Sequence, residues 1–313
     1  MNTFIRAIEV WRPSDDGMLL EFGGGLFGNA IGFAAISRSM CFGRGEGLPG
    51  QAWEEGRPVM LKHFEGSNFR RSTAAKAAGL RCALALPIFV GERLTAVLAF
   101  FCGDTNAHAG ALELWRNDPR ATGDLTLVDG YYGSDGAALE AVSRDAYLPK
   151  GSGLPGVAWQ RGTAVFIADI GASARFLRTQ AATDLGIDRG LAIPCTARGD
   201  TTFVASFLSA PATPIAQRIE RWLPDAARGQ LQRADGFCEG TGPLPSAPAA
   251  VEAGDAGGSI GRAFASGVPM MAKAVIGEPE AIAAVAAAAG VRSLAAIPVV
   301  VDGAVVEVVA LYF

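Results

Sequence analysis

Short apolar runs alternate with polar turns along the first third of the chain. Residues 8–11 and 18–22 are two such runs, and the turn at residues 13–17 contains Pro, Asp and Gly. Apolar runs of this length on either side of turn residues predict a β-hairpin. Two longer apolar runs, residues 82–90 and 94–101, are joined by a tight Gly-Glu turn and predict central strands. The pattern therefore predicts an antiparallel sheet.

Two short helices are predicted between these strands. Residues 48–55 have a Pro near their start and are followed by Gly56, whereas residues 70–78 are rich in Ala and are followed by Gly79. Proline suits the first turn of a helix, and glycine readily takes the left-handed conformation that ends one. Residues 58–64 are predicted to be extended, and the Gly-rich stretch between the hairpin and the first helix is predicted to be loop. Together the elements predict an α+β unit.

The same order of elements occurs three times in the chain. A Glu two positions before a Trp opens each copy, and successive copies of this Glu are 104 and then 107 positions apart. A spacing of this size indicates duplicated domains, because solenoid repeats have periods of about 20 to 50 residues. We therefore expect three units, at residues 1–104, 105–211 and 212–313. The recurring pairs are Glu9 and Trp11, Glu113 and Trp115, and Glu220 and Trp222.

Turn and packing residues recur in the same register and resemble those of a GAF domain. The first unit carries Gly-Glu-Gly-Leu-Pro-Gly at residues 45–50, the second repeats Gly-Leu-Pro-Gly at 153–156, and the third has a degenerate start at 258–261. The other landmarks of the resemblance are Gly56, Pro58, Gly79, residues 84–87 and 94–101 in unit 1, Ala158, Trp159, Gly162, Asp169, Ile193 and Pro194 in unit 2, and Gly267, Pro269, Gly290, Ile297 and Pro298 in unit 3.

The resemblance implies an α+β fold of three tandem GAF-like units. Each would have a central antiparallel sheet of about five or six strands, with short helices mainly on one face that enclose a small-molecule pocket. GAF domains usually also have longer helices at both ends, which cover the opposite face of the sheet. This sequence leaves no room for them, since residues 102–111 are small and polar and indicate a linker. We also expect no output module after the third unit.

An uncovered sheet face would expose apolar side chains to water, at a cost of roughly 25 cal/mol per Å². We therefore expect the three units, or two chains, to pack their sheets against one another, with Trp11, Trp115 and Trp222 near those contacts. The Glu and Trp of each pair project from one face of a strand. We interpret the Trp as a packing anchor and the Glu as a hydrogen-bond partner, with a ligand platform as the alternative.

Composition excludes several classes of function. The net charge is -4 without a basic stripe, which argues against a nucleic-acid partner. No stretch of 18 uncharged apolar residues or secretory signal occurs, so we expect a cytoplasmic protein that does not enter membranes. The five cysteines form no CxxC pair and only two histidines are present, which argues against a metal site, a disulfide framework or a catalytic constellation. No cofactor follows from the residues, and we expect a protein that is not an enzyme.

Candidate ligand contacts come from a position where the copies disagree. Residues 68–71 read Asn-Phe-Arg-Arg and residues 175–178 read Arg-Phe-Leu-Arg, but residues 277–280 carry two acids instead. An aromatic ring two positions before an Arg suits an aromatic or anionic small molecule, whereas a solvated Arg beside a core Phe is the alternative. The predicted ligand-binding residues are Phe42, Trp53, Phe64, Phe69 and Arg71 in unit 1, and Trp159, Phe166, Phe176 and Arg178 in unit 2.

Three functional hypotheses remain open. The first is a non-enzymatic sensor or regulatory protein that binds a small-molecule effector and acts through a protein partner or a homo-oligomer. The second is a structural or oligomerisation scaffold whose pockets are filled by side chains. The third is a redox enzyme that uses Cys82 or Cys102, although neither residue lies in a motif of the GAF branch that reduces free methionine sulfoxide. The signatures of cyclic-nucleotide and bilin-binding GAF domains are also missing.

Overall fold

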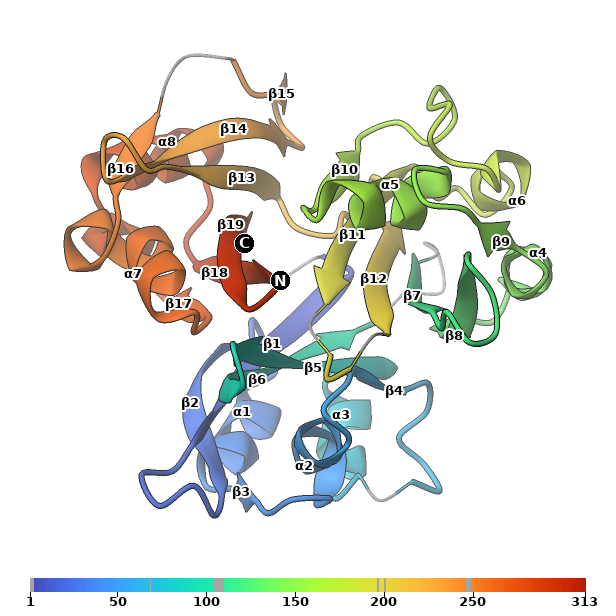
Figure 1. Cartoon of the computed structure of the whole chain (residues 1–313), viewed down its shortest axis with the longest axis horizontal. Coiled ribbons are helices and arrows are strands. Elements are labelled where there is room, and N and C mark those ends of the chain that lie inside the picture. The colour runs from blue at the N-terminus through green and yellow to red at the C-terminus, as the bar shows by residue number, and fades with distance from the viewer. Residues whose placement is uncertain (1–2, 68, 104–109, 196, 200, 246–248) are drawn as a thin grey trace.

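Three antiparallel sheets lie around a common centre, and the helices lie on the outside (Figure 1). The computed structural model describes residues 3–67, 69–103, 110–195, 197–199, 201–245 and 249–313. Asn68, the boundary between units 1 and 2, and most of the predicted linker at 102–111 lie outside the described residues. The arrangement confirms the predicted α+β fold of three GAF-like units.

Unit 1 forms a six-stranded sheet in the order β3-β2-β1-β6-β5-β4. The predicted hairpin and the two central strands are present, and both predicted helices are found within two residues of their expected ends. Its elements are β1 (Ile5–Pro13), β2 (Leu20–Leu26), α1 (Ile31–Arg38), β3 (Cys41–Phe42), α2 (Gly47–Glu55), β4 (Val59–Leu61), α3 (Ser72–Ala77), β5 (Cys82–Val90) and β6 (Arg93–Cys102).

Unit 2 repeats this topology with the strand order β9-β8-β7-β12-β11-β10. The elements are β7 (Gly110–Asn117), β8 (Leu125–Tyr131), α4 (Ala137–Arg144), β9 (Tyr147–Leu148), α5 (Gly153–Arg161), β10 (Val165–Ile167), α6 (Thr179–Thr183), β11 (Arg189–Cys195) and β12 (Thr202–Ser209).

Unit 3 keeps the central order β14-β13-β19-β18-β17 but differs at one edge. Between β14 and α7 it has two short strands and a 3-10 turn where units 1 and 2 have a helix and one short strand. Its elements are β13 (Arg218–Asp225), β14 (Gln230–Cys238), β15 (Gly242–Pro243), β16 (Ala250–Glu252), η1 (Asp255–Gly257), α7 (Gly258–Ser266), β17 (Met270–Ala272), η2 (Val275–Gly277), α8 (Glu280–Ala289), β18 (Leu294–Val301) and β19 (Ala304–Tyr312).

The first helix of units 1 and 2 was not predicted from the sequence. Helices α1 and α4 occupy the stretch expected to be Gly-rich loop, and neither begins with a side-chain capping hydrogen bond. Without a Ser, Thr, Asp or Asn cap, a helix of this length has no sequence signal at its start. Each helix is fixed instead by tertiary packing, since Phe33 of α1 and Leu139 of α4 are buried in the cores of their units.

The two faces of each sheet pack into different cores. On β1, Ile8 and Val10 join a central core shared by all three units, while Ala7 and Trp11 face the helices of unit 1. This division follows from the two-residue alternation of side chains along a strand. The central core has the same kind of contribution from the other units, with Leu112, Leu114, Ile193, Ile219, Ile297 and Leu311.

The central core confirms that the three sheets pack against one another. The expectation that the recurrent tryptophans lie near those contacts is wrong. Trp11, Trp115 and Trp222 are each buried in the separate core between sheet and helices of their own unit. Side chains alternate between the two faces of a strand, and the tryptophans lie on the face that packs against the helices. This face is opposite the inter-unit contacts.

The units contact one another in a closed ring. Gly56 ends α2 of unit 1, and its carbonyl oxygen accepts a hydrogen bond of 2.8 Å from the Arg198 amide of unit 2. Gly267 ends α7 of unit 3, and its carbonyl oxygen accepts a hydrogen bond of 2.7 Å from the Thr95 hydroxyl of unit 1. The corresponding Gly162 of unit 2 lies against Val301 of unit 3. Each of these glycines has a positive φ of 62° to 64°, which glycine adopts more readily than other residues. Each also lies at a contact with the neighbouring unit.

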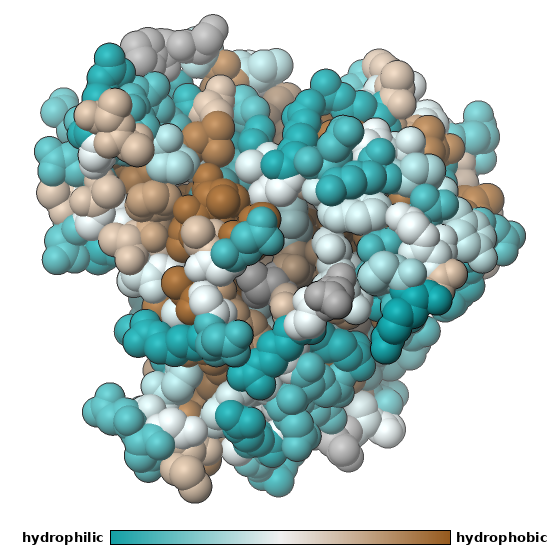
Figure 2. All heavy atoms as spheres, viewed as in Figure 1, coloured by the Kyte–Doolittle hydropathy of each residue, from teal (hydrophilic) through white to brown (hydrophobic). Residues whose placement is uncertain are grey.

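The surface between the lobes is partly apolar. In the space-filling view, brown atoms gather over β18 and β19 of unit 3 and continue to the junction with unit 1 (Figure 2).

No helix in the described part of the chain is long and apolar enough to cross a membrane.

Candidate functional site

Arg71 of unit 1 is an interior residue that forms an ion pair. It precedes α3, and its guanidinium donates two hydrogen bonds to Glu9 on β1, one of 2.5 Å to Oε1 and one of 3.0 Å to Oε2. Ser37 of α1 contributes its hydroxyl oxygen at 2.5 Å, and the Trp11 indole donates to Glu9 Oε2 at 3.0 Å. The carboxylate and the guanidinium are both buried, so the pair replaces the water that each would otherwise need.

Aromatic rings fill the space around this ion pair. The Arg71 guanidinium lies 4.5 Å from the centre of the Phe33 ring and 5.1 Å from that of Phe69. Phe64 and Phe69 stack with their ring centres 4.6 Å apart. Cation–π contacts of this kind are favourable for an arginine withdrawn from water. The predicted contacts Phe42, Phe64, Phe69 and Arg71 therefore pack on one another in the interior of unit 1.

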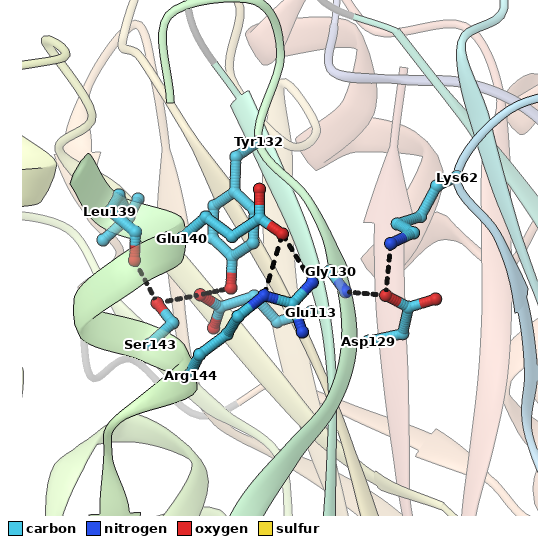
Figure 3. A network of polar contacts seen from close by, with 9 residues as sticks. All are labelled: Lys62, Glu113, Asp129, Gly130, Tyr132, Leu139, Glu140, Ser143 and Arg144. Carbon is cyan, nitrogen blue, oxygen red and sulfur yellow. Dashed lines mark hydrogen bonds and ion pairs between the residues drawn. The ribbon is translucent and has the colours of Figure 1, made fainter. Parts of the chain in front are cut away.

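Unit 2 contains a corresponding ion pair with an additional phenol. Arg178 pairs with Glu113 on β7 and contacts the Ser143 hydroxyl, while Trp115 donates to Glu113 Oε2 at 2.9 Å. Tyr132 donates to Glu113 Oε1 at 3.0 Å (Figure 3). Burial raises the pKa of Tyr132, and the Glu113 carboxylate raises it further, which keeps the phenol protonated as a donor.

Unit 3 retains the carboxylate but takes its arginine from another position. Where units 1 and 2 have an Arg before the last helix, unit 3 has Pro279 before α8. Arg218, two residues before Glu220 on β13, donates instead to Glu220 Oε1 at 2.9 Å. Trp222 and Tyr312 donate to Glu220 Oε2 at 3.0 and 2.6 Å. Every unit therefore binds its recurrent glutamate through a guanidinium and an indole.

The repeated Glu was predicted from the sequence to form a hydrogen bond. The sequence did not predict that Arg71 and Arg178 would be the groups that bind it. The alternative of a solvated Arg is wrong, because Arg71 and Arg178 are only 3% and 8% exposed. A signal was present in the repeat itself, since Arg218 replaces Ala7 and Ala111 in the one unit that lacks the helix arginine. Loss of an Arg at one position and gain of an Arg at another indicates a shared carboxylate.

The structure does not bring the predicted residues of unit 2 into one site. Phe176 lies beside Arg178, with the guanidinium 4.9 Å from its ring centre. Phe166 lies on β10 and contacts Phe237 of unit 3, with ring centres 5.4 Å apart. Trp159 lines a different cavity of about 460 Å³ at the junction of the three units. Trp53 of unit 1 is buried in the core of that unit, and the Arg44 guanidinium lies 4.7 Å from its ring centre.

An open groove lies on the surface of unit 2, between α4 and α6. It has a volume of about 590 Å³, and Arg178 forms part of its lining. Three of its residues are apolar and exposed, at 43% for Val142, 64% for Tyr147 and 60% for Leu177. Large apolar side chains gathered on one concave surface are typical of a binding site. The ligand-binding role of the nine predicted residues stays a prediction, but this groove connects one of them to solvent.

No cluster of three metal-ligating side chains occurs among the residues described by the structure. The thiol of Cys195 lies at the junction of the units, where burial raises its pKa to about 12. Cys82 and Cys102 are fully buried and face each other across β5 and β6. The structure thus places no thiol of this pair at the surface, where a dissolved substrate would reach it.

Comparison with known families gives one match, which spans unit 1 and the first strand of unit 2. A family model described as GAF domain matches residues 6–117. No curated protein matches the chain.

Similar solved structures each cover about one third of the chain. They include the GAF domain of A. aeolicus nlh2 in an inactive state, with 19% identity over 33% of this chain and 60% of that chain and a TM-score of 0.26. The free methionine-R-sulfoxide reductase of Neisseria meningitidis has 18% identity over 32% of this chain and 51% of that chain, with a TM-score of 0.24. An NreA protein of Staphylococcus aureus, mutated in its nitrate binding site, has 13% identity over 32% of this chain and 74% of that chain, with a TM-score of 0.27. At these scores the comparison assigns neither ligand nor activity.

Proposed function

We propose, on the premise that residues 6–117 form a GAF domain, that the chain is a non-enzymatic regulatory protein that binds a small molecule in unit 2. The observation that carries the proposal is the groove between α4 and α6, where Val142, Tyr147 and Leu177 are exposed together. Burying such side chains against a ligand would be favourable by roughly 25 cal/mol per Å² of apolar area.

The chemistry of the groove favours a mainly apolar ligand with one polar acceptor. Most of the lining is Ala, Val, Leu and Tyr, with Arg178 as the buried polar group. Its two terminal nitrogens already donate to Glu113, and no hydrogen bond from its Nε occurs among the described contacts. An acceptor on the ligand that reaches this guanidinium would couple the groove to the interior ion pair.

Unit 1 differs from unit 2 at the positions that form the groove. Cys41 on β3 corresponds to Tyr147 on β9, and Arg70 corresponds to Leu177. Arg70 forms an ion pair of 2.7 Å with Glu46, so the equivalent surface of unit 1 is charged where unit 2 has Leu177, although Ile36 is exposed there as Val142 is in unit 2. An interior filled by aromatic side chains and a charged pair at the surface favour a structural role for unit 1, so the scaffold hypothesis is proposed for that unit alone.

Occupancy of unit 2 would reach the other units through its sheet. Strand β11 contacts unit 3 through Arg189, whose Nε donates to Glu239 Oε1 at 3.1 Å. A ligand that rigidifies unit 2 would stabilise this contact and so alter the surface offered to a protein partner or another copy of the chain.

The test uses N-phenyl-1-naphthylamine, an uncharged probe that fluoresces in apolar sites. We expect it to bind the native chain and to raise the thermal midpoint, since a hundredfold excess over Kd stabilises by about 2.7 kcal/mol. Leu177→Arg copies the residue of unit 1 and is expected to weaken binding by at least about tenfold, or 1.4 kcal/mol. Arg70→Leu is the matched control and is expected to leave probe affinity unchanged, because unit 1 still has Cys41 where the groove has Tyr147. Equal probe affinity of wild type and Leu177→Arg would contradict the proposal.

A further inference from the structure

A second groove lies between unit 3 and unit 1 and is lined by cations from both. It has a volume of about 480 Å³, and its lining includes Arg38 from the end of α1, Lys273 after β17 and Arg292 before β18. We propose that this groove binds a small organic dianion, a phosphate ester or dicarboxylate that carries a hydrocarbon group.

No Asp or Glu side chain among the described residues pairs with any of the three cations. Neither Asp nor Glu occurs in the described lining of the groove, and none of the ion pairs in the described part of the chain includes Arg38, Lys273 or Arg292. Within the described part of the chain, the Arg38 guanidinium lies over the ring of Phe27, 5.7 Å from its centre. Cations that converge on one concave surface create a local positive potential, and a bound anion would neutralise it.

The repeated architecture provides an internal reference for this charge. Lys62 follows β4 as Lys273 follows β17, and Arg144 ends α4 as Arg38 ends α1. Arg81 corresponds to Arg292, because each amide donates at 2.8 Å to the carbonyl of the residue opposite, Cys102 and Phe313 respectively. The boundary between units 1 and 2 therefore has the same three cationic positions.

At that boundary, however, acids neutralise two of the three cations. Lys62 pairs with Asp129 of β8 at 2.9 Å, and Arg144 donates to Glu140 of α4 at 3.0 Å (Figure 3). In unit 1 the corresponding positions are Gly24 on β2 and Ala34 on α1. The groove between units 3 and 1 has thus kept the cations and lacks both acids.

The third boundary, between units 2 and 3, lacks cations at the positions of Lys273 and Arg292, and the neighbouring Arg189 is neutralised by Asp188 and Glu239. Ala168 follows β10 in place of the lysine, and Asp188 precedes β11 in place of the arginine. The excess of positive charge is therefore specific to one of three equivalent positions, whereas a requirement of the fold would recur at all three.

Apolar residues beside the cations specify the rest of the ligand. Phe27 and Ile31 of unit 1 line the groove, and Ile31 is 76% exposed. Phe313 lines the opposite side. A ligand with two negative charges and a hydrocarbon group would satisfy both parts, with the charges at Arg38, Lys273 and Arg292 and the hydrocarbon against Ile31.

The test is isothermal titration of the full chain with phenyl phosphate and with benzylmalonate, at low salt. These two probes distinguish a phosphate from a dicarboxylate, and inorganic phosphate tests the contribution of the hydrocarbon group. We expect one site per chain and binding that weakens at high salt. We expect Lys273→Ala and Arg292→Ala each to weaken binding of the preferred probe by about fivefold to tenfold, since a charge-assisted contact is lost. Both residues are exposed, so the variants are expected to fold.

Lys62→Ala is the matched control at the neutralised boundary, and its anion affinity is expected to stay within about twofold of wild type. Leu177→Arg, which tests the groove of unit 2, is likewise expected to leave anion binding unchanged, so the two proposals succeed or fail separately. The proposal would be overturned if neither dianion bound, if Lys273→Ala and Arg292→Ala bound as tightly as wild type, or if Lys62→Ala weakened binding as much as they do.

Discussion

Arg71 and Glu9 are 62 positions apart and form a two-pronged ion pair inside unit 1. The pair joins the first strand of the sheet to the start of α3, and Ser37 ties it to α1. Two buried charges are costly to desolvate, and their mutual attraction offsets that cost only while both partners are present. The ion pair is therefore stable only while β1, α1 and α3 keep their positions relative to one another.

Removal of Arg71 alone is expected to be strongly destabilising. Arg71→Met leaves the Glu9 carboxylate buried without its cation, which should lower the free energy of unfolding by about 3 to 5 kcal/mol. Urea denaturation followed by tryptophan fluorescence would measure the change. Glu9→Gln combined with Arg71→Met should recover part of the loss, because no charge is then left unpaired.

Arg70→Met is the control for this experiment. Arg70 is the neighbouring residue, and its exposed ion pair with Glu46 should contribute less than about 1 kcal/mol. Equal effects of the Arg70 and Arg71 variants would contradict the structural role assigned to the buried pair.

The fold was predictable from sequence because its signals are local and repeated. The apolar runs of β5 and β6 and the glycines after α2, α5 and α7 each report a backbone requirement of nearby residues. The ion pairs of units 1 and 2 join residues that are 62 and 65 positions apart, so no local pattern reports them, and the signal lies instead in the comparison of the three units. The groove of unit 2 was also missed, because it depends on how α4 and α6 are placed and on the exposure of Tyr147 and Leu177.

A single apolar substitution at the centre should destabilise all three units together. Leu98 of unit 1 is fully buried in the shared core, near Ile193 of unit 2 and Ile297 of unit 3. Leu98→Ala should cost about 2 to 5 kcal/mol, because a cavity forms where the three sheets meet. Every unit contains a buried tryptophan, so one cooperative fluorescence transition at lower urea is the expected result.

The exposed Ile36→Ala provides the comparison, since a surface substitution of this kind usually changes stability by less than about 0.5 kcal/mol. Separate transitions, of which Leu98→Ala shifted only the one for unit 1, would show that the sheets do not stabilise one another.

The cysteines should differ sharply in their reactivity. Burial raises the pKa of Cys195 to about 12, so at pH 8 this side chain is almost entirely the unreactive thiol. Cys41 is exposed, whereas Cys82 and Cys102 are buried. Under native conditions iodoacetamide should modify Cys41 first, as measured by peptide mass spectrometry, and all five cysteines should react in denaturant. Rapid native modification of Cys82 or Cys102 would instead favour the redox-enzyme hypothesis.

Glu307 should give the interface between units 2 and 3 a distinctive dependence on pH. Its side chain is fully buried and accepts hydrogen bonds from Arg221 Nε at 2.5 Å and from the Ala164 amide at 2.7 Å. Burial raises the pKa of Glu307, and this effect outweighs the opposite influence of Arg221. The folded state therefore binds the proton more tightly than the unfolded state does.

Because the pKa of Glu307 is higher in the folded state, its contribution to stability decreases as the pH rises. The stabilising contribution of a group with a raised pKa is complete below its unfolded value, about 4.3 for Glu, and is lost as the pH rises to the folded value. Glu307→Gln resembles the protonated form at every pH, so its free energy of unfolding relative to wild type should increase from pH 4 towards neutrality. Urea denaturation of both proteins at a series of pH values measures this difference.

Glu65→Gln provides a control of opposite sign on the surface. Its hydrogen bond and ion pair with Lys76 lower the pKa of Glu65, so the stabilising contribution is present above the unfolded value and is lost as the pH falls. The Glu65 variant should therefore be less stable than wild type near neutrality and should approach it in acid. A Glu307 variant that followed the same course as the Glu65 variant would show that Arg221 outweighs burial, and that the carboxylate is held at this interface as a favourable ion pair.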